Sequence, residues 1–245
     1  MLNVDMAGLF ACLHSTNWLG SGKLLSDSTD GGLVMHFTVR GPNSVIAANE
    51  YGVRLANGDN LSGPVGAPSI LGLTVVSDQA IYVTGHYNRT NKKPAAVMAD
   101  SLNILSNNWY VAATRSFTDN LSTQTLANRI PVDTTQNMAV LSGSDTTGNI
   151  EGGGGQGGSY SGGLENFPRF HEDWNGSRTL NYRGSFVSLN RPRRVNGLWG
   201  QANVYSAPAR NWDYDTSFDN AANLPPLSPR FVYLKQELFV RDFEQ

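Results

Sequence analysis

The sequence predicts a mainly β fold, with a right-handed parallel β-helix (a solenoid-like stack of short strands) favoured over a β-sandwich. Charged residues make up only 16% of the 245 residues, and Asn, Ser, Thr and Gly take their place. Exposed helix faces normally carry Glu and Lys, whereas uncharged polar residues and glycine suit turns. From Leu33 onward, short apolar runs alternate with polar turns, which is the pattern of frequent short strands.

The favoured solenoid depends on two adjacent segments that resemble successive coils. Residues 73–88 read LTVVSDQAIYVTGHYN and residues 92–108 read KKPAAVMADSLNILSNN. In each segment a small polar corner separates two short apolar strands, and Gly or Asn closes the turn. A parallel β-helix returns to the same position after roughly 20 residues, as these segments do. A β-sandwich remains the alternative, because the repeat has no constant register. Strands are predicted over 33–40, 51–55, 70–76, 80–85, 95–105, 108–113, 138–143, 179–189 and 230–240.

One short amphipathic helix is expected at the start, over Asn3–Leu13, with Asn3 or Asp5 as its N-cap. A second short helix is predicted over Leu121–Ile130. The first 13 residues contain Asp5 and no basic start, so they make a poor signal peptide.

The organisation predicted from composition has three parts. Residues 1–150 form the β-rich region with the N-terminal helix, and residues 151–163 are a glycine-rich loop or linker. Residues 164–245 are an irregular segment, rich in aromatic residues and arginine, that packs on the same domain. Within it, Leu164–Trp174 is predicted to be a helix or tight turn, and Asn211–Pro229 an extended segment outside any ladder.

Charge and hydropathy exclude several classes of function. The net charge of −2 provides no overall field that would attract nucleic acid. No run of apolar residues approaches the roughly 20 needed for a membrane span. Cys12 is the only cysteine, which excludes an intramolecular disulfide framework, and we expect its thiol to be buried.

Four segments resemble a known family: 51–58 (YGVRLANG), 81–109 (IYVTGHYNRTNKKPAAVMADSLNILSNNW), 162–189 (GGLENFPRFHEDWNGSRTLNYRGSFVSL) and 222–243 (ANLPPLSPRFVYLKQELFVRDF). They are similar to the C-terminal domain of PilX-type minor pilins and of the secreted protein of the hormogonium polysaccharide system. The resemblance covers roughly residues 30–243 and carries over no catalytic residue.

The resemblance implies a non-enzymatic, structural or adhesive component of a type IV pilus or surface-polysaccharide apparatus, located outside the cell or in the envelope. Its partners would be pilin-like or other envelope proteins, and an acidic polysaccharide could bind its basic and aromatic second half. The predicted contact residues are Phe167, Arg169, Phe170, His171, Trp174, Arg193 and Arg194.

Two alternative functions stay open. A carbohydrate-active enzyme, either a polysaccharide lyase or a hydrolase, would need carboxylates about 5 to 10 Å apart in one groove if it were a glycosidase. The candidates are Asp100, Glu172, Asp173, Asp213 and Asp215. A purely structural cap with no ligand would use the aromatic residues as core.

No cofactor is expected from the motifs. Adjacent His171, Glu172 and Asp173 would point in different directions on a helix or strand, which argues against a shared metal ion. Asp213 and Asp215 could hold a structural calcium ion, although carboxylates that cap backbone amides in a turn are the simpler interpretation.

Overall fold

The computed structural model describes residues 1–245 except 17, 21, 41–50, 144–167, 189–203 and 230–245. The described chain is mainly β with parallel sheets, one of which is curled into a half-barrel, and it has one short N-terminal helix. The glycine-rich stretch 151–163 and the predicted strand 230–240 lie outside the described residues, as do Phe167, Arg193 and Arg194.

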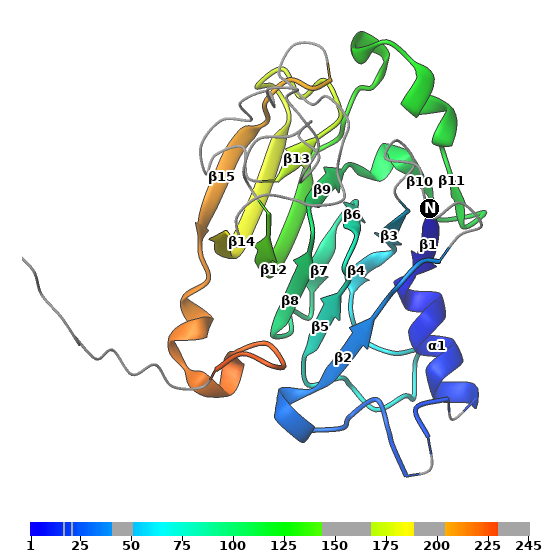
Figure 1. Cartoon of the computed structure of the whole chain (residues 1–245), viewed down its shortest axis with the longest axis vertical. Coiled ribbons are helices and arrows are strands. Elements are labelled where there is room, and N and C mark those ends of the chain that lie inside the picture. Colours follow the sequence, from blue (N-terminus) through cyan, green and yellow to red (C-terminus); the bar gives the residue numbers. More distant parts are fainter. Residues whose placement is uncertain (17, 21, 41–50, 144–167, 189–203, 230–245) are drawn as a thin grey trace, which may run out of the picture.

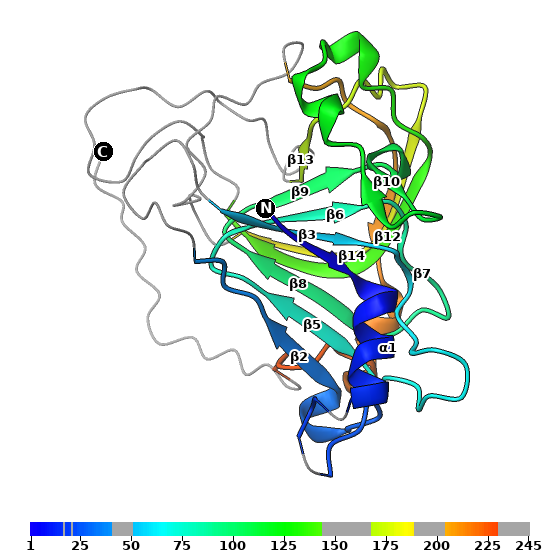
Figure 2. The same ribbon diagram turned by 90° about the vertical axis from the view of Figure 1, so that its right-hand side faces the viewer.

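Two parallel sheets make up most of the fold (Figures 1 and 2). We call the five-stranded sheet, in the order β1-β3-β6-β9-β13, sheet A. Sheet B has eight strands, in the order β15-β14-β12-β8-β5-β2, with β4 and β7 attached beside β12. The strands of sheet A are β1 (Leu2–Asp5), β3 (Gly52–Ala56), β6 (Ala80–Thr84), β9 (Leu102–Leu105) and β13 (Arg169–Phe170). Those of sheet B are β2 (Leu33–His36), β4 (Gly58–Asn60), β5 (Leu73–Val76), β7 (Tyr87–Thr90), β8 (Ala95–Ala99), β12 (Thr134–Ser142), β14 (Thr179–Ser188) and β15 (Ala209–Tyr214).

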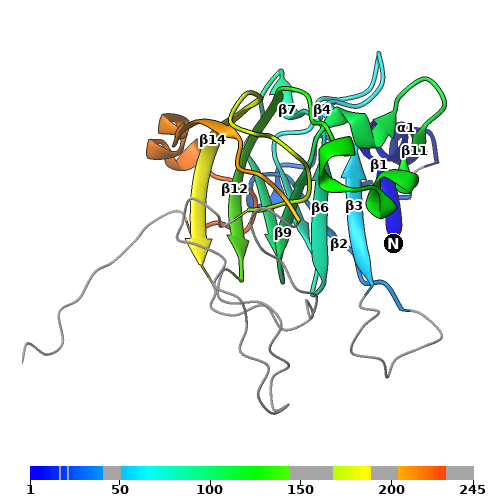
Figure 3. The ribbon, with the colours of Figure 1, turned by 90° about the horizontal axis from the view of Figure 1, so that it is seen from above.

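From β1 to β14 the chain returns repeatedly from one sheet to the other, so strands that pair within this span are separated in sequence by a visit to the other sheet. The last pair of sheet B, β14 and β15, consists of consecutive described strands. The two segments expected to be successive coils pair as predicted. Leu73 pairs with Ala95 in sheet B and Ile81 pairs with Leu102 in sheet A. Every described pairing in the two sheets is parallel, unlike the antiparallel pairing of an immunoglobulin-type sandwich. Viewed from above, the strands lie side by side in a curved array (Figure 3).

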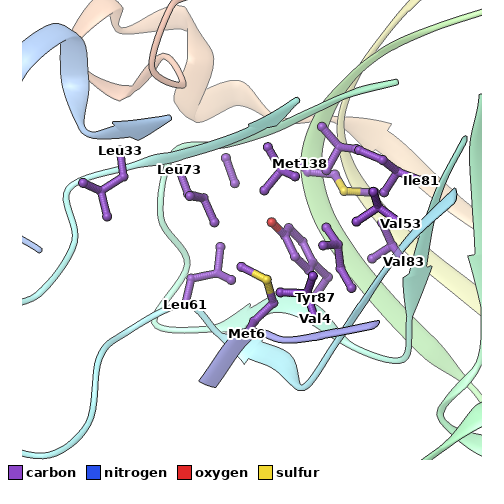
Figure 4. Packing of buried hydrophobic residues seen from close by; sticks show 14 of the residues in the cluster. Val4, Met6, Leu33, Val53, Leu61, Leu73, Ile81, Val83, Tyr87 and Met138 are labelled. Atoms are coloured by element: carbon purple, nitrogen blue, oxygen red, sulfur yellow. The ribbon is translucent and has the colours of Figure 1, made fainter. Parts of the chain in front are cut away.

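The inward-facing side chains of both sheets form an apolar core. In Figure 4, Tyr87 lies close to Met6 and Val4, while Leu33 and Leu73 approach from sheet B. Every second residue of a strand faces inward, so the short apolar strands provide a continuous buried surface.

The N-terminal helix α1 spans Met6–Thr16 and packs Met6, Phe10 and Leu13 into this core. The expected cap at Asp5 is confirmed, since its Oδ1 accepts a hydrogen bond from the Gly8 backbone N–H at 2.9 Å. The helix does not extend back to Asn3, because Leu2–Asp5 form strand β1 against β3. The expectation of a buried Cys12 thiol was wrong: Cys12 is exposed.

Three other sequence predictions differ, wholly or in part, from the described structure. Within Leu164–Trp174, predicted to be a helix or tight turn, Arg169–Phe170 form strand β13, paired with β9. The first part of the predicted extended segment, Asn211–Tyr214, belongs to the ladder between β14 and β15. The predicted helix over Leu121–Ile130 is replaced by two short 3₁₀ helices, η3 (Asp119–Thr123) and η4 (Leu126–Asn128).

Candidate functional site

Within the described part of the chain, the outer side of sheet A, which is turned away from the core, brings charged and aromatic side chains together. Successive strands place one residue each in a single register: Asn3, Arg54, Tyr82, Asn103 and Arg169. We call this set the outer row. The neighbouring register contains Val4, Leu55, Val83, Ile104 and Phe170, which belong to the apolar clusters. We call that set the inner row.

A pocket with a volume of about 450 Å³ lies over the outer row. One wall is sheet A, with Arg54 and Tyr82 from the row and His171 just beyond β13. The other wall comes from the segment after β9, which contains the 3₁₀ helix η2 (Asn107–Trp109), the hairpin of β10 (Tyr110–Val111) and β11 (Ser116–Phe117), and η3. The lining residues are Met1, Arg54, Tyr82, Leu105, Trp109, Asp119, Ser122, Arg129 and His171.

Arg54 is the most constrained cation of this pocket. Its residue is only 3% exposed, and its guanidinium lies over the Phe117 ring at 3.8 Å from the centroid. Nε donates to Asn3 Oδ1 at 3.0 Å and Nη1 donates to Asp119 Oδ1 at 2.7 Å. The Nη2 group is buried and has no hydrogen-bond acceptor among the described residues. Arg54 therefore retains donor capacity in a site of low exposure, where an unpaired donor is costly.

Arg129 supplies a second cation from the opposite wall. Its Nη1 donates to the His171 backbone oxygen at 2.8 Å, which ties the two walls together. Its Nε is buried and likewise has no hydrogen-bond acceptor within the described part of the chain. Two arginine side chains with remaining N–H donors thus line one pocket, and an anion with several oxygens is the ligand such donors bind best.

His171 and Tyr82 add aromatic surface without adding charge. Their rings are 5.7 Å apart at an angle of 37°, and His171 Nε2 lies 2.8 Å from Asn103 Oδ1. Burial, followed by the nearby Arg169 and Arg129 cations, lowers the pKa of His171 to about 3. The imidazole is therefore neutral at physiological pH. Burial also raises the pKa of Tyr82, so its hydroxyl remains protonated.

The residues predicted as contacts from sequence fall into different environments. His171 lines the pocket, and Arg169 is in the outer row but only 3% exposed. Phe170 and Trp174 have no exposed surface and pack together with Tyr205 in a separate cluster. These two rings are therefore core residues, the arrangement expected of a structural cap, and they do not form an exposed stacking platform.

Three of the carboxylates considered for catalysis make separate hydrogen bonds in the described part of the chain. Glu172 is fully buried and accepts hydrogen bonds from Ser106 N at 2.7 Å and Ser106 Oγ at 2.6 Å. Burial outweighs these bonds and raises the pKa of Glu172 to about 7. Asp173 accepts from the Ser206 hydroxyl, and Asp215 accepts from Lys92 Nζ through both oxygens. Each of these three carboxylates serves a different local structure.

At the predicted calcium position, Asp213 and Asp215 each accept hydrogen bonds from nearby backbone amides. Asp215 Oδ1 also accepts from Ser217 N at 3.1 Å and caps a 3₁₀ helix, η6 (Thr216–Asp219). Asp213 Oδ1 accepts from the adjacent Tyr214 N at 2.8 Å. Within the residues that the structure describes, no three His, Cys, Asp or Glu side chains are grouped so that they could hold a metal ion.

None of the described helices is long and apolar enough to cross a membrane.

Sequence reasoning missed Arg54, Tyr82, Asp119 and Arg129. A signal existed for the first two, because Arg54 and Tyr82 are the polar positions that alternate with apolar ones in the predicted strands 51–55 and 80–85. No local signal pointed to Asp119 and Arg129, which reach the pocket only through the path of the loop after β9.

The chain matches no known family model, no curated protein and no solved structure.

Proposed function

We propose that this chain is a non-enzymatic binding protein that recognises an acidic polysaccharide through the pocket over the outer row. The observation that carries the proposal is the pair of arginines, Arg54 and Arg129, that line one pocket and keep buried N–H donors without acceptors among the described residues. The oxygens of an acidic sugar would accept from these donors. Tyr82 offers the apolar ring face and polar edge that sugar recognition uses.

The cellular setting of the proposal comes from the sequence resemblance to type IV pilus-associated and surface-polysaccharide proteins. In that setting the protein would be a structural or adhesive component outside the cell or in the envelope, with pilin-like proteins as its partners. Fractionation of the source cells tests this part, and recovery of the native protein only from the cytosol would contradict it.

For the architecture we propose a right-handed parallel β-helix. The repeated return of the chain to each of two parallel sheets supports it. The paired residues Leu73 and Ala95, and likewise Ile81 and Leu102, are separated in sequence by close to one coil of roughly 20 residues. The right hand follows the strong general preference for right-handed parallel crossovers. The large insertion between β9 and β12 would then be a loop on a regular stack.

The binding test uses the whole chain and isothermal titration calorimetry with oligogalacturonate, an acidic glycan, and dextran, a neutral one. We expect Arg129→Gln to weaken oligogalacturonate binding at least about tenfold, because hydrogen bonds to charged groups are worth about 1.5 to 3 kcal/mol. Arg178→Gln is the matched control, since it removes the same charge from an exposed residue outside the pocket lining.

Absence of oligogalacturonate binding by the wild-type chain, or equal losses in the two variants, would contradict a specific acidic-glycan site. The same incubations, followed by measurement of polysaccharide length and reducing ends, test the alternative. Shortened chains would favour the carbohydrate-active enzyme.

A further inference from the structure

The pocket already contains a carboxylate bound to its buried arginine. Asp119 Oδ1 lies 2.7 Å from Arg54 Nη1. The Asp119 side chain is 67% exposed, whereas that of Arg54 is 4% exposed. A solvent-exposed carboxylate bound to a buried guanidinium is the contact that an acidic ligand would make at the same place. Asp119 therefore marks a position where a planar carboxylate fits.

The segment that carries Asp119 is otherwise held by local contacts. Among the described residues, the other hydrogen bonds made by 119–128 stay within Thr118–Arg129. Ser122 Oγ donates to the Asp119 backbone oxygen at 2.6 Å, for example. Neither η3 nor η4 has a buried residue. Replacing Asp119 on Arg54 would thus release a surface turn without disturbing the apolar core.

The rest of the pocket fits a sugar that bears one carboxylate. Neutral His171 and the Tyr82 hydroxyl can exchange hydrogen bonds with sugar hydroxyls, and neither repels an anion. Nε2 of His171 is next to an amide oxygen, Asn103 Oδ1, so Nε2 donates there and Nδ1 remains an acceptor. The charged contacts are left to Arg54 and Arg129.

We infer that the Arg54 position takes the carboxylate of a uronate residue, and that Asp119 is a built-in competitor which this carboxylate replaces. The inference rests on the proposed binding of an acidic polysaccharide. It adds the chemical class of the acidic group and a means by which the chain itself limits affinity. If Arg54 is free of Asp119 in only a fraction of the molecules, the apparent affinity for the ligand is reduced to that fraction of the intrinsic affinity.

The test compares wild-type chain with Asp119→Asn by calorimetry against oligogalacturonate. Loss of the internal competitor is expected to tighten binding about fivefold, which corresponds to one partly exposed ion pair. Asp59→Asn is the matched control, since it breaks another Arg–Asp pair, to Arg89 at 2.7 Å, outside the pocket lining, and should leave binding unchanged. Equal tightening by both variants would reduce the effect to net charge and overturn the inference.

A second measurement needs no variant. Hydrogen exchange at the amides of 119–128 in the wild-type chain should become faster when oligogalacturonate binds, because the turn loses its link to Arg54. Slower or unchanged exchange on binding would overturn the competitor role.

Two further ligands test the carboxylate class. Methyl-esterified oligogalacturonate should not bind, and dextran sulfate should bind more weakly than oligogalacturonate. Equal binding of either one would overturn the uronate assignment. If Arg129→Gln abolishes oligogalacturonate binding and Asp119→Asn leaves it unchanged, the proposed function stands and the inference fails. If neither wild type nor Asp119→Asn binds an acidic glycan, both fail.

Discussion

The inner row and the outer row of sheet A lie one residue apart on the same five strands, yet they differ completely in chemistry. The inner row consists of Val4, Leu55, Val83, Ile104 and Phe170, each at most 8% exposed. The outer row consists of Asn3, Arg54, Tyr82, Asn103 and Arg169. Because side chains alternate across a sheet, one face of each strand can stabilise the fold while the other presents polar groups.

The difference between the rows lies in what kind of contact each residue makes, since burial alone does not separate them. Arg54, Asn103 and Arg169 are also at most 3% exposed. Inner-row residues gain stability from apolar area removed from water. Outer-row residues must keep polar partners, as Asn103 does with His171. Substitutions in the inner row should therefore change stability, and substitutions around the outer row should change binding.

The largest expected effect comes from adjacent residues on opposite sides of the sheet. Phe170→Ala should lower the free energy of unfolding by about 3 to 5 kcal/mol, because it leaves a cavity in a packed aromatic cluster. His171→Ala, one residue further on, should cost only about 1 kcal/mol, the value of an ordinary hydrogen bond. Urea denaturation of both variants measures this difference, and similar losses would remove the distinction between the two faces.

Glu172 is an exception to the apolar character of the inner side. It lies two residues after Phe170 and is fully buried, but it is ionisable. Its folded pKa of about 7 is raised above 4.5 by burial. The fold therefore favours the protonated form, whose stabilising effect is complete below pH 4.5 and is lost as pH rises through 7. This group alone should lower the free energy of unfolding by about 3 kcal/mol over that interval.

Glu172→Gln sharpens this point, because an amide can accept from Ser106 N and donate to Ser106 Oγ without ionising. We expect the variant to be more stable than wild type at pH 8 and about equal to it at pH 4. Denaturation series at several pH values measure the slope, and a slope unaffected by the substitution would show that Glu172 does not titrate in this interval.

The smallest effect is expected away from both rows. Arg89 and Asp59 form an ion pair at 2.7 Å with side chains 46% and 37% exposed. Asp59→Asn should change the free energy of unfolding by no more than about 1 kcal/mol, because water screens such pairs. Thermal unfolding provides the measurement. A larger loss would mean that this pair supports the β4–β7 edge more strongly than its exposure implies.

Local pattern was enough to predict part of the fold. The strands that contain Leu73, Ile81, Val97 and Ile104 were recognisable from their apolar runs, and Asp5 was one of the two caps expected for the first helix. The strand at Arg169–Phe170 was not recognisable, because its two residues are too few to show a period. Similarly, β15 was hidden because the prolines that follow it made the whole segment look extended and unpaired.

By itself, the sequence determined that the chain is mainly β, that 73–105 contains several short strands and that a short helix lies near the N-terminus, since these properties depend on residues close together in the chain. Only the tertiary structure decided which residues make the pocket. Arg54, Tyr82, Asp119, Arg129 and His171 come from five separate segments, and parallel register together with loop path brings them together. Phe170 and Trp174 illustrate the same limit, because an aromatic residue has the same local pattern in a core as on a binding surface, and only packing distinguishes the two.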